Sequence, residues 1–358
     1  MLPRYNGRMP VSIVRPRPPA LQAADPRHRQ PSVAVVVCTH AGAGRIESAL
    51  RSILAQSCAP DEVLVVDNAP PDSRIADLVR DRFPEARYEV EPVLGLDFAR
   101  NAALERAASE VVAFLDDDAI AGPDWVGRVR GAFADNPRLV ASCCRVTALR
   151  LDTEARRLIE ANGGLDRGAT PVALPRDARR TLNGFGGSLV AWATRIAVGC
   201  GMAVRRREAL AMGGFDTALD LGAVLPGGGD CDFVWRVLTA GHEVEYLPGA
   251  TILHDHREDL DSAVRQICGH QRALVALLTK IVRESRGTER LSALMFLGWR
   301  LAKPGVRLGK RLVAADPLPA GILLRMWREC WVGLITYPAA RRIALDRIET
   351  IRPTQSTS

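Results

Sequence analysis

Apolar and polar positions alternate in two ways along the first third of the chain. Short continuous apolar runs are typical of strands buried on both faces of a parallel sheet. Between them, apolar residues recur every three or four positions, as on one face of a helix. The strand-like runs are 32–39, 62–67, 88–90 and 111–115, and the helical segments are 46–54, 75–82 and 98–108. This alternation predicts an α/β fold with a doubly wound, mostly parallel sheet flanked by helices.

Polar side chains follow three of the predicted strands. Thr39 and Asp67 end the first two, and three consecutive aspartates at 116–118 follow the run 111–115. Doubly wound sheets bind ligands beyond the carboxyl ends of their strands. Burying three adjacent carboxylates without a partner would cost too much free energy, because like charges would be desolvated side by side. They therefore need water, a helix N-terminus or a cation. A solvated turn before a helix that begins near Pro123 is the alternative explanation.

Composition divides the rest of the chain. Residues 1–31 are rich in Pro and Arg, which predicts a disordered basic tail. Patterned sequence over 32–260 predicts a folded domain, and amphipathic patterns such as 264–280 predict a helical extension over 261–350. The most apolar stretch, 185–204, contains several Gly and a central Arg, so we interpret it as core segments rather than a membrane span.

Charge is unevenly distributed along the 358 residues, whose formal net charge is +7. The first 31 residues and the segment after residue 280 are basic, whereas the middle is acidic. A nucleic-acid-binding domain would carry its basic residues on one folded face, so this distribution argues against nucleic acid. It fits a body that binds a cation or a nucleotide–metal complex, with ends that contact an anionic membrane surface.

Cysteine usage and the N-terminus bear on location. The eight Cys show no CxxC pair, which is typical of a reduced protein without a disulfide framework or zinc module. Arg and Pro stand where a signal peptide would have its apolar core. We therefore predict a cytoplasmic protein that is peripheral on the inner face of the cell membrane if its basic ends bind lipid.

Two common nucleotide-binding motifs are absent from the sequence. The loop after the first predicted strand reads HAGAGR, which lacks the GxGxxG of dinucleotide folds. No GxxxxGK[ST] phosphate loop occurs either. A Rossmann dehydrogenase and a P-loop phosphotransferase are therefore disfavoured.

Seven segments, in this order, resemble those of family 2 glycosyltransferases with a GT-A fold. They are CTH, VLVVDN, GLDFARN, FLDDDA, GCGMAVRRREALAMGGFD, GGGDCDFVWRVLTAGHEV and ILHDH. The resemblance covers residues 32–256. It implies a GT-A catalytic domain over 32–260, with a nucleotide-binding half at 32–120 and an acceptor half at 121–260. It also implies sugar transfer from a nucleotide donor to an acceptor hydroxyl, with inversion at the anomeric carbon.

The resemblance implies a metal site. Asp118 and His254 would hold Mn²⁺ or Mg²⁺, which stabilises the negative charge of the departing diphosphate. His256 would replace His254 if the strand register were shifted, and a purely structural histidine is the alternative.

The resemblance also implies nucleotide-sugar contacts. They are Thr39, Asp67, Arg100, Asn101, Asp116 and Asp117. A turn cap is the alternative role for Asp67, and an outward polar helix face is the alternative for Arg100 and Asn101. Related sequences place an Asn or Arg within about three residues of this Thr. In this chain Arg45 lies six residues after Thr39, so we assign it no role.

The acceptor side would centre on Asp230, which resembles the general base that removes the proton of the attacking hydroxyl. Gly229 stands where the family has Glu, and Asp232 would compensate in part. Asp216, in a GGFD turn, would contact the donor sugar. A helix N-cap is the alternative role for Asp230.

The expected partners and the competing functions follow from this assignment. The donor is predicted to be a UDP-sugar in preference to a dTDP- or GDP-sugar, and the acceptor a glycan, a lipid-linked precursor or a small molecule. The alternatives are a nucleotidyltransferase acting on sugar phosphates and a catalytically inactive glycan- or membrane-binding scaffold. The segment 322–335 is either a helix packed on the catalytic domain or a helix on the membrane surface.

Overall fold

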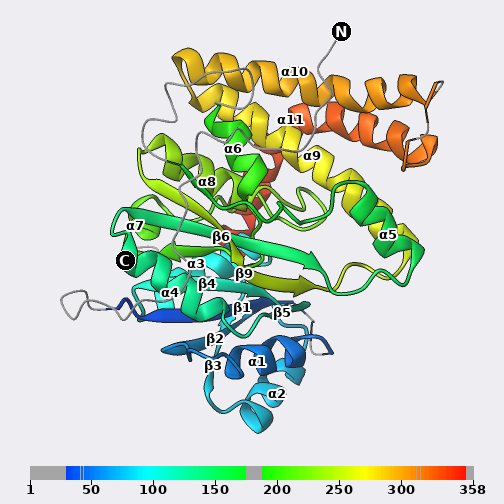
Figure 1. Ribbon diagram of the computed structural model, residues 1–358. Coiled ribbons are helices and arrows are strands. Elements are labelled where there is room, and N and C mark those ends of the chain that lie inside the picture. The colour runs from blue at the N-terminus through cyan, green and yellow to red at the C-terminus, as the bar shows by residue number, and fades with distance from the viewer. Residues whose placement is uncertain are drawn as a thin grey trace.

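A single nine-stranded sheet with helices on both faces organises the protein (Figure 1). The computed structural model describes residues 30–40, 42, 44–174, 188–311, 313–314 and 316–351. The predicted basic tail lies outside the described residues except for its last two positions.

The strands are β1 (Val33–Thr39), β2 (Glu62–Asn68), β3 (Ala86–Glu91), β4 (Val111–Asp116), β5 (Ala119–Ala121), β6 (Leu139–Ala148), β7 (Val172–Leu174), β8 (Ala203–Arg205) and β9 (Glu243–His254). The helices are α1 (Ile46–Leu54), α2 (Arg74–Arg82), α3 (Leu96–Arg106), α4 (Trp125–Asp135), α5 (Glu154–Ala161), α6 (Leu189–Ile196), α7 (Arg206–Ala211), α8 (Gly229–Thr239), α9 (Leu260–Glu284), α10 (Gly287–Lys310) and α11 (Ala320–Ile351). The strand order is β3-β2-β1-β4-β8-β6-β9-β5, and β7 pairs with β9.

The first half of the sheet is parallel, as the sequence predicts. Strand β1 lies between β2 and β4, with Thr39 opposite Asp67 and Cys38 opposite Asp116. The apolar residues of β1 from Val33 to Val37 are fully buried because helices cover both faces of the sheet. The carboxyl ends of these strands therefore meet at one edge, where their terminal polar residues are brought together.

The second half of the sheet is mixed. Strand β8 runs antiparallel to both β4 and β6, and β6 runs parallel to β9. Strand β9 is long, and its far end also pairs antiparallel with the short β5, which follows the aspartate triplet. This last pairing brings residues more than a hundred positions apart in sequence to the same edge as the triplet.

Two hydrophobic cores lie on opposite faces of the sheet. One contains the buried residues of α1, α2 and α4 together with the alternate β1 residues Val33, Val35 and Val37. The other contains Ala34 and Val36 with α3, α6, α8 and α9. The stretch 188–204, within the most apolar segment of the sequence, forms α6 and β8, whose apolar residues are buried in these cores. They are core segments, as the sequence predicts.

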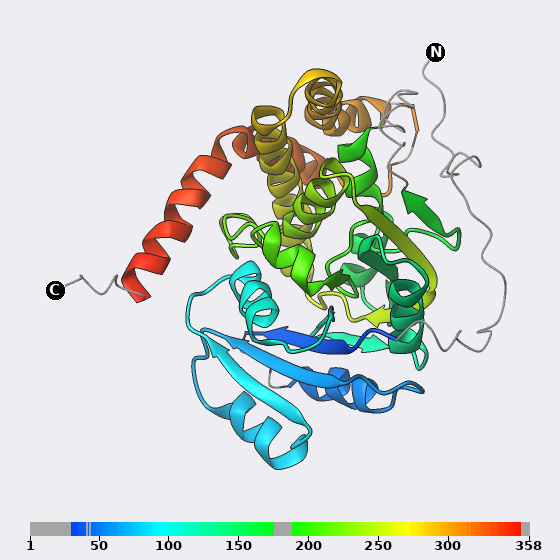
Figure 2. The same ribbon diagram turned by 90° about the vertical axis from the view of Figure 1, so that its left-hand side faces the viewer.

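A C-terminal helical region follows the sheet domain. Helix α9 packs against α10 and α11, and the last part of α11 extends away from the other helices (Figure 2). Within 322–335, Met326, Cys330 and Gly333 are buried, so this segment packs on the protein along one side. Of the helices in the described ranges, none combines the length and apolar character needed to span a membrane.

Candidate active site

The carboxyl edge of the parallel strands borders a cavity of about 780 Å³. Strands, loops and helices from both halves of the domain contribute to its lining. The sequence-predicted residues that line it are Thr39, Arg100, Asp116, Asp117, Asp118, Asp230 and His254. The described residues between 30 and 256 thus bring most of the predicted site residues to one space.

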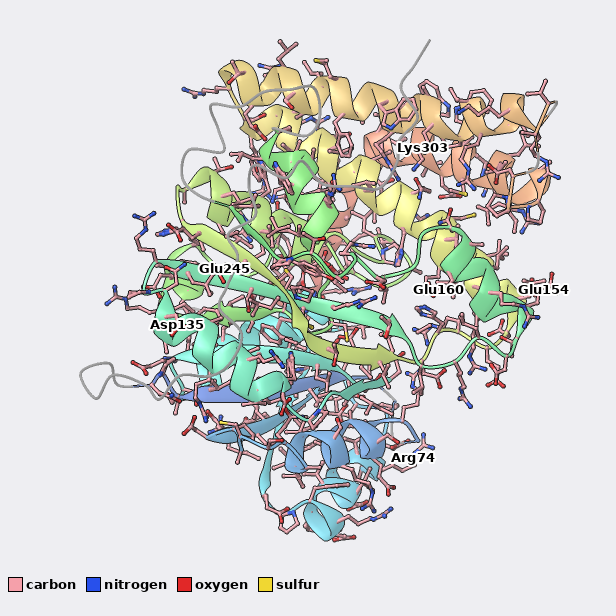
Figure 3. All side chains as sticks on the ribbon, viewed as in Figure 1. Arg74, Asp135, Glu154, Glu160, Glu245 and Lys303 are labelled. Carbon is pink, nitrogen blue, oxygen red and sulfur yellow. The ribbon has the colours of Figure 1, made fainter. Side chains whose placement is uncertain are left out.

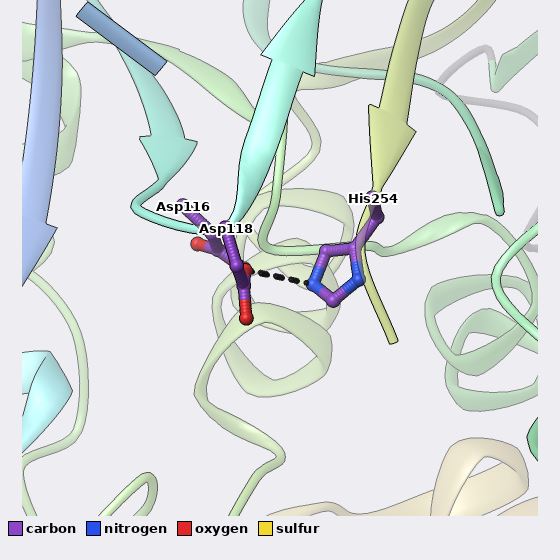
Figure 4. A group of neighbouring side chains, drawn as sticks. All are labelled: Asp116, Asp118 and His254. Atoms are coloured by element: carbon purple, nitrogen blue, oxygen red, sulfur yellow. Dashed lines mark ion pairs between the residues drawn. The ribbon is translucent and has the colours of Figure 1, made fainter. Parts of the chain in front are cut away.

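Asp116, Asp118 and His254 form a compact group of potential metal ligands (Figure 4). The imidazole Nε2 of His254 lies 3.2 Å from Asp118 Oδ1 and 3.9 Å from Asp116 Oδ2. Their ligand atoms all lie within 4.8 Å of one another. Two carboxylates and an imidazole are a donor set that fits a divalent cation, so the residues present match the predicted metal.

The pairing of β5 with β9 fixes the position of His254. Ala119 lies opposite His254, and the Asp255 N–H donates to the Asp118 carbonyl at 2.9 Å. His256 is instead buried, with Nε2 2.7 Å from Glu160 Oε1. The register of β9 therefore places His254, and not His256, beside the aspartate triplet.

Electrostatics in this group favour a bound cation. Burial and the neighbouring Asp118 raise the pKa of Asp116 to about 6. Burial disfavours ionisation of both Asp118 and His254, but their mutual interaction outweighs it. That interaction lowers the pKa of Asp118 and raises the pKa of His254. A divalent cation at this point would take over the role of the imidazolium and relieve the repulsion between the carboxylates.

Asp117 is held differently from its two neighbours. Its Oδ2 accepts a hydrogen bond of 2.6 Å from Thr39 Oγ1, and Arg45 Nη2 lies 3.5 Å from its Oδ1. Gly42 passes so close that a Cβ there would overlap the Asp117 carboxylate. Arg45 also lies 3.8 Å from Asp118 Oδ2. The triplet thus contributes Asp116 and Asp118 to the group of potential metal ligands, and Asp117 and Asp118 also lie beside Arg45 of the loop after β1.

A second charged cluster surrounds Arg100 on α3. The guanidinium Nη1 pairs with Asp97 Oδ1 at 2.9 Å and approaches Asp220 Oδ2 at 3.7 Å. Burial and the neighbouring Asp220 raise the pKa of Asp97 well above its usual value. One carboxylate oxygen of Asp97, Oδ2, is buried without a hydrogen-bond partner among the described residues. Arg100 is therefore the central cation of an acidic pocket wall, not part of an outward helix face.

Asp230 lies in the first turn of α8 and faces the cavity. Its Oδ2 accepts a 2.8 Å hydrogen bond from the Gly199 N–H, and Oδ1 accepts from the Cys231 N–H at 2.7 Å. The N-cap of α8 is Gly228, with φ of 104°. The alternative role of Asp230 as N-cap is therefore wrong.

The structure leaves no room for the Glu that the resemblance places at position 229, where this chain has Gly. A Cβ on Gly229 would overlap Asp97 Oδ2 and come within 2.7 Å of Asp220 Oδ2. The Gly229 N–H donates to Asp220 Oδ2 at 2.7 Å. Two carboxylates from other elements thus occupy the space beside position 229.

Two predicted nucleotide contacts do not line the cavity. Asp67 is fully buried, and its Oδ2 accepts a 2.9 Å hydrogen bond from the Tyr88 hydroxyl. Asn101 uses its side-chain amide on the backbone of Phe215, donating to its carbonyl at 2.9 Å and accepting from its N–H at 2.7 Å. Asn101 therefore holds the GGFD turn in place.

The two predicted sugar contacts, Asp216 and Asp232, lie behind the cavity in a buried ion cluster. Lys280 Nζ on α9 lies 2.5 Å from Asp232 Oδ1 and 2.8 Å from Asp216 Oδ2. Asp232 is fully buried and also pairs with Arg236 at 2.7 Å. These carboxylates join the helical region to the sheet domain, and neither lies among the residues that line the cavity.

Replacing Lys280 by Met should destabilise the protein strongly. The fully buried Asp232 would keep Arg236 but lose its ammonium partner, and breaking a buried pair by removing one side costs about 3–5 kcal/mol. Urea unfolding should report this loss, whereas the exposed Lys310→Met should change stability by less than about 0.5 kcal/mol. Equal stabilities of the two variants would contradict the structural role of this cluster.

Two residues that line the cavity, Asp220 and Arg257, were not found from the sequence. Neither was Asp97, the buried ion-pair partner of Arg100. Asp97 lies within the GLDFARN segment, three positions before Arg100, so an i,i+3 ion pair was a usable signal. Asp220 adopts a left-handed φ of 47° in an irregular loop, and no local pattern marks it.

The mixed sheet and the polar cavity at its carboxyl edge define a GT-A type α/β protein. A family model described as "Glycosyl transferase family 2" matches residues 34–211. The chain belongs to this family, as the resemblance of its motifs implied.

Individual relatives agree with this assignment. A pre-mycofactocin glycosyltransferase of Mycobacterium tuberculosis is 28% identical over 258 residues, covering 70% of this chain and 47% of that protein. A glucosyl-dolichyl phosphate glucuronosyltransferase of Haloferax volcanii is 36% identical over 114 residues, covering 30% of this chain and 36% of that protein. The chain spans about half the length of the mycobacterial relative.

A solved structure shares the fold. It is a mannosyltransferase from Pyrobaculum calidifontis in complex with GDP-Man and Mn²⁺, with a TM-score of 0.54 and 20% identity. The match covers 88% of this chain and 87% of that one. The likeness therefore extends beyond the strands into the helical region.

Proposed function

We propose that this protein is a metal-dependent, inverting glycosyltransferase that moves a sugar from a nucleotide-sugar to an acceptor hydroxyl. The observation that carries the proposal is that two separate groups of side chains border the same cavity. Asp116, Asp118 and His254 offer ligands for a cation, and Asp230 faces the same space from α8. Family membership supports the choice of reaction.

The proposed roles follow from the chemistry of each group. A bound divalent cation would supply electrostatic stabilisation of the departing diphosphate. Arg45 and Arg257, which also line the cavity, add positive charge for the phosphates. Asp230 takes the proton of the acceptor hydroxyl, and its Oδ2 is oriented by the Gly199 N–H. One base acting in a direct displacement gives inversion at the anomeric carbon.

The donor and acceptor are proposals at the level of class. UDP-sugars remain our first donor to test, with GDP-sugars beside them because the Pyrobaculum mannosyltransferase was solved with GDP-Man. For the acceptor, the Haloferax relative is named for a glucosyl-dolichyl phosphate substrate, which favours testing a lipid-linked sugar first.

We also propose that the helical region contacts an anionic membrane surface. On α11, Trp331 and Ile335 are 55% and 75% exposed, opposite the side that packs on the protein. Arg325 and Arg328 precede them on the same helix. Exposed aromatic and aliphatic residues beside arginines suit the interface of a membrane with acidic lipids.

The glycosyltransferase proposal can be tested by ligand-induced stabilisation. A panel of UDP-, dTDP- and GDP-sugars is added to the protein with Mn²⁺, with Mg²⁺ or with a chelator. At least one donor should raise the melting temperature in the presence of metal only, because a ligand that binds the folded state stabilises it. Absence of any metal-dependent shift across the panel would overturn the proposal.

Changing Asp118 to Asn should remove the metal-dependent part of that shift. The variant loses a carboxylate ligand, and even outer-shell partners of a metal are worth about 10–100-fold in affinity. Direct titration with Mn²⁺ measures the loss. The matched control is Asp124→Asn, an exposed carboxylate just before α4, which should bind Mn²⁺ like the wild type. Unchanged Mn²⁺ affinity in Asp118→Asn would place the metal elsewhere.

A further inference from the structure

A small polar pocket lies in the helical region, where α9, α10 and α11 meet the end of α5. Its volume is about 90 Å³, well above the ~10–15 Å³ that one water molecule needs. We call it the cation pocket, and its lining residues are Asn162, Gln271, Arg300, Lys303, Pro304, Arg307 and Met326. It shares no residue with the lining of the catalytic cavity.

Three cations of α10 converge on this pocket. Arg300, Lys303 and Arg307 are three and four positions apart, so they project from one side of the helix. Figure 3 labels Lys303 in this layer of helices. Because α9 and α11 pack against α10, the three side chains are directed into an enclosed space rather than spread over a surface.

The positive charge of the pocket is only partly balanced. Arg307 pairs with Asp316, with Nη2 2.6 Å from Oδ1. Arg300 donates to the neutral Gln271 Oε1 at 2.7 Å, and its Nε is buried without a hydrogen-bond partner. Among the described residues, no carboxylate forms an ion pair or hydrogen bond with Arg300 or Lys303.

This arrangement is costly for the protein without a ligand. Burial, together with Arg300 and Arg307, lowers the pKa of Lys303 to about 8. Burial and the neighbouring Arg307 also lower the pKa of Arg300. Like charges in a shared, partly dry space repel one another, and an anion among them would reverse the sign of that interaction.

We propose that the cation pocket binds the phosphate group of a ligand, at a site distinct from the catalytic cavity. Arg300 and Lys303, which have no acidic partner among the described residues, offer guanidinium and ammonium donors for the acceptor oxygens of a tetrahedral phosphate. Gln271 and Asn162 add neutral polar groups to the wall. The phosphate comes from either an acidic lipid headgroup or free phosphate in solution, since both present the same oxygens.

The test uses the full chain with a chelator and no donor, so its outcome is independent of the glycosyltransferase proposal. Inorganic phosphate is titrated against chloride of equal ionic strength while the melting temperature is followed. Phosphate should stabilise the wild type, and Lys303→Gln should weaken phosphate binding by about tenfold or more, as expected for a lost charged hydrogen bond.

Matched variants separate this site from general charge effects. Lys303→Arg keeps the charge and should keep phosphate protection. Lys310→Gln removes an exposed cation from the same helix and should behave like the wild type. Without phosphate, Lys303→Gln should melt above the wild type, because it removes a partly buried cation that has no acidic partner among the described residues. Phosphate bound in the catalytic cavity would protect Lys303→Gln as well as the wild type.

A flotation experiment distinguishes the two sources of phosphate. Vesicles of phosphatidylcholine are compared with vesicles that also contain phosphatidic acid. Flotation that needs phosphatidic acid, needs Lys303 and is competed by free phosphate would identify a lipid headgroup. Lys303-dependent protection by phosphate, without Lys303-dependent flotation, would identify free phosphate. If neither readout depends on Lys303, the proposal is wrong.

Discussion

Replacing Asp230 by Asn should lower kcat by about 10²–10⁴-fold, the usual contribution of a general base. The amide oxygen of Asn can still accept the hydrogen bond from the Gly199 N–H, although the Cys231 N–H loses its side-chain acceptor, so we expect the side chain to keep one of its two anchors. What is lost is the ability to take a proton. Initial rates at saturating donor measure the effect, and the melting temperature checks that the fold is intact.

The variant should also bind the donor nucleotide with unchanged affinity. Asp230 belongs to α8, whereas the ligand group Asp116, Asp118 and His254 lies at the ends of β4, β5 and β9. Asp124→Asn serves as control for the loss of one carboxylate and should retain full activity. If Asp230→Asn loses nucleotide binding together with turnover, Asp230 belongs to the donor site and another group is the base.

Restoring the family Glu at position 229 should inactivate this protein rather than improve it. A side chain there overlaps the Asp97 carboxylate and adds a third acid beside Asp97 and Asp220. We expect Gly229→Glu to lower the free energy of unfolding by about 3 kcal/mol or more, from overpacking and buried like charges. Urea unfolding and initial rates measure the two effects.

A compensating change tests the explanation. In Gly229→Glu combined with Asp97→Ala, the new carboxylate has space and can take over the pairing with Arg100. The double variant should recover a large part of the lost stability, which is a coupling expected only for residues in contact. Gly131→Glu in α4 is the matched control, since nothing lies within 4 Å of a Cβ at that helical glycine. A single variant Gly229→Glu as stable as the wild type would disprove this account.

The strands, the place of the triplet and the place of His254 at a strand end could be predicted because their signals are local. Continuous apolar runs identify buried strands, and polar residues at their ends identify the ligand edge. His254 directly ends an apolar strand pattern, and the structure places it beside Asp116 and Asp118. The pairing of Ala119 with His254 then supplies the long-range contact that the pattern alone did not contain.

The remaining residues were misplaced or missed where tertiary contacts decide their roles. Asp216 and Asp232 sit in motifs of the family, but their partner Lys280 lies on a helix beyond the resemblance. The acids beside Gly229 come from α3 and from an irregular loop, so their proximity depends on the closed fold. The motifs therefore showed which segments of the chain lie near the site. They did not show which way each side chain points, because packing against distant elements decides that.

The irregular middle of β9 restricts where residues can be inserted into or deleted from this strand. Between Leu247 and Thr251 the ladder with β6 is interrupted, and regular pairing resumes from Thr251 to His254. Side chains alternate between faces along a strand, so one inserted residue after Thr251 would turn the imidazole away from Asp118. Insertions and deletions should therefore accumulate at 248–250, where the backbone can absorb them, and occur beyond it only in pairs.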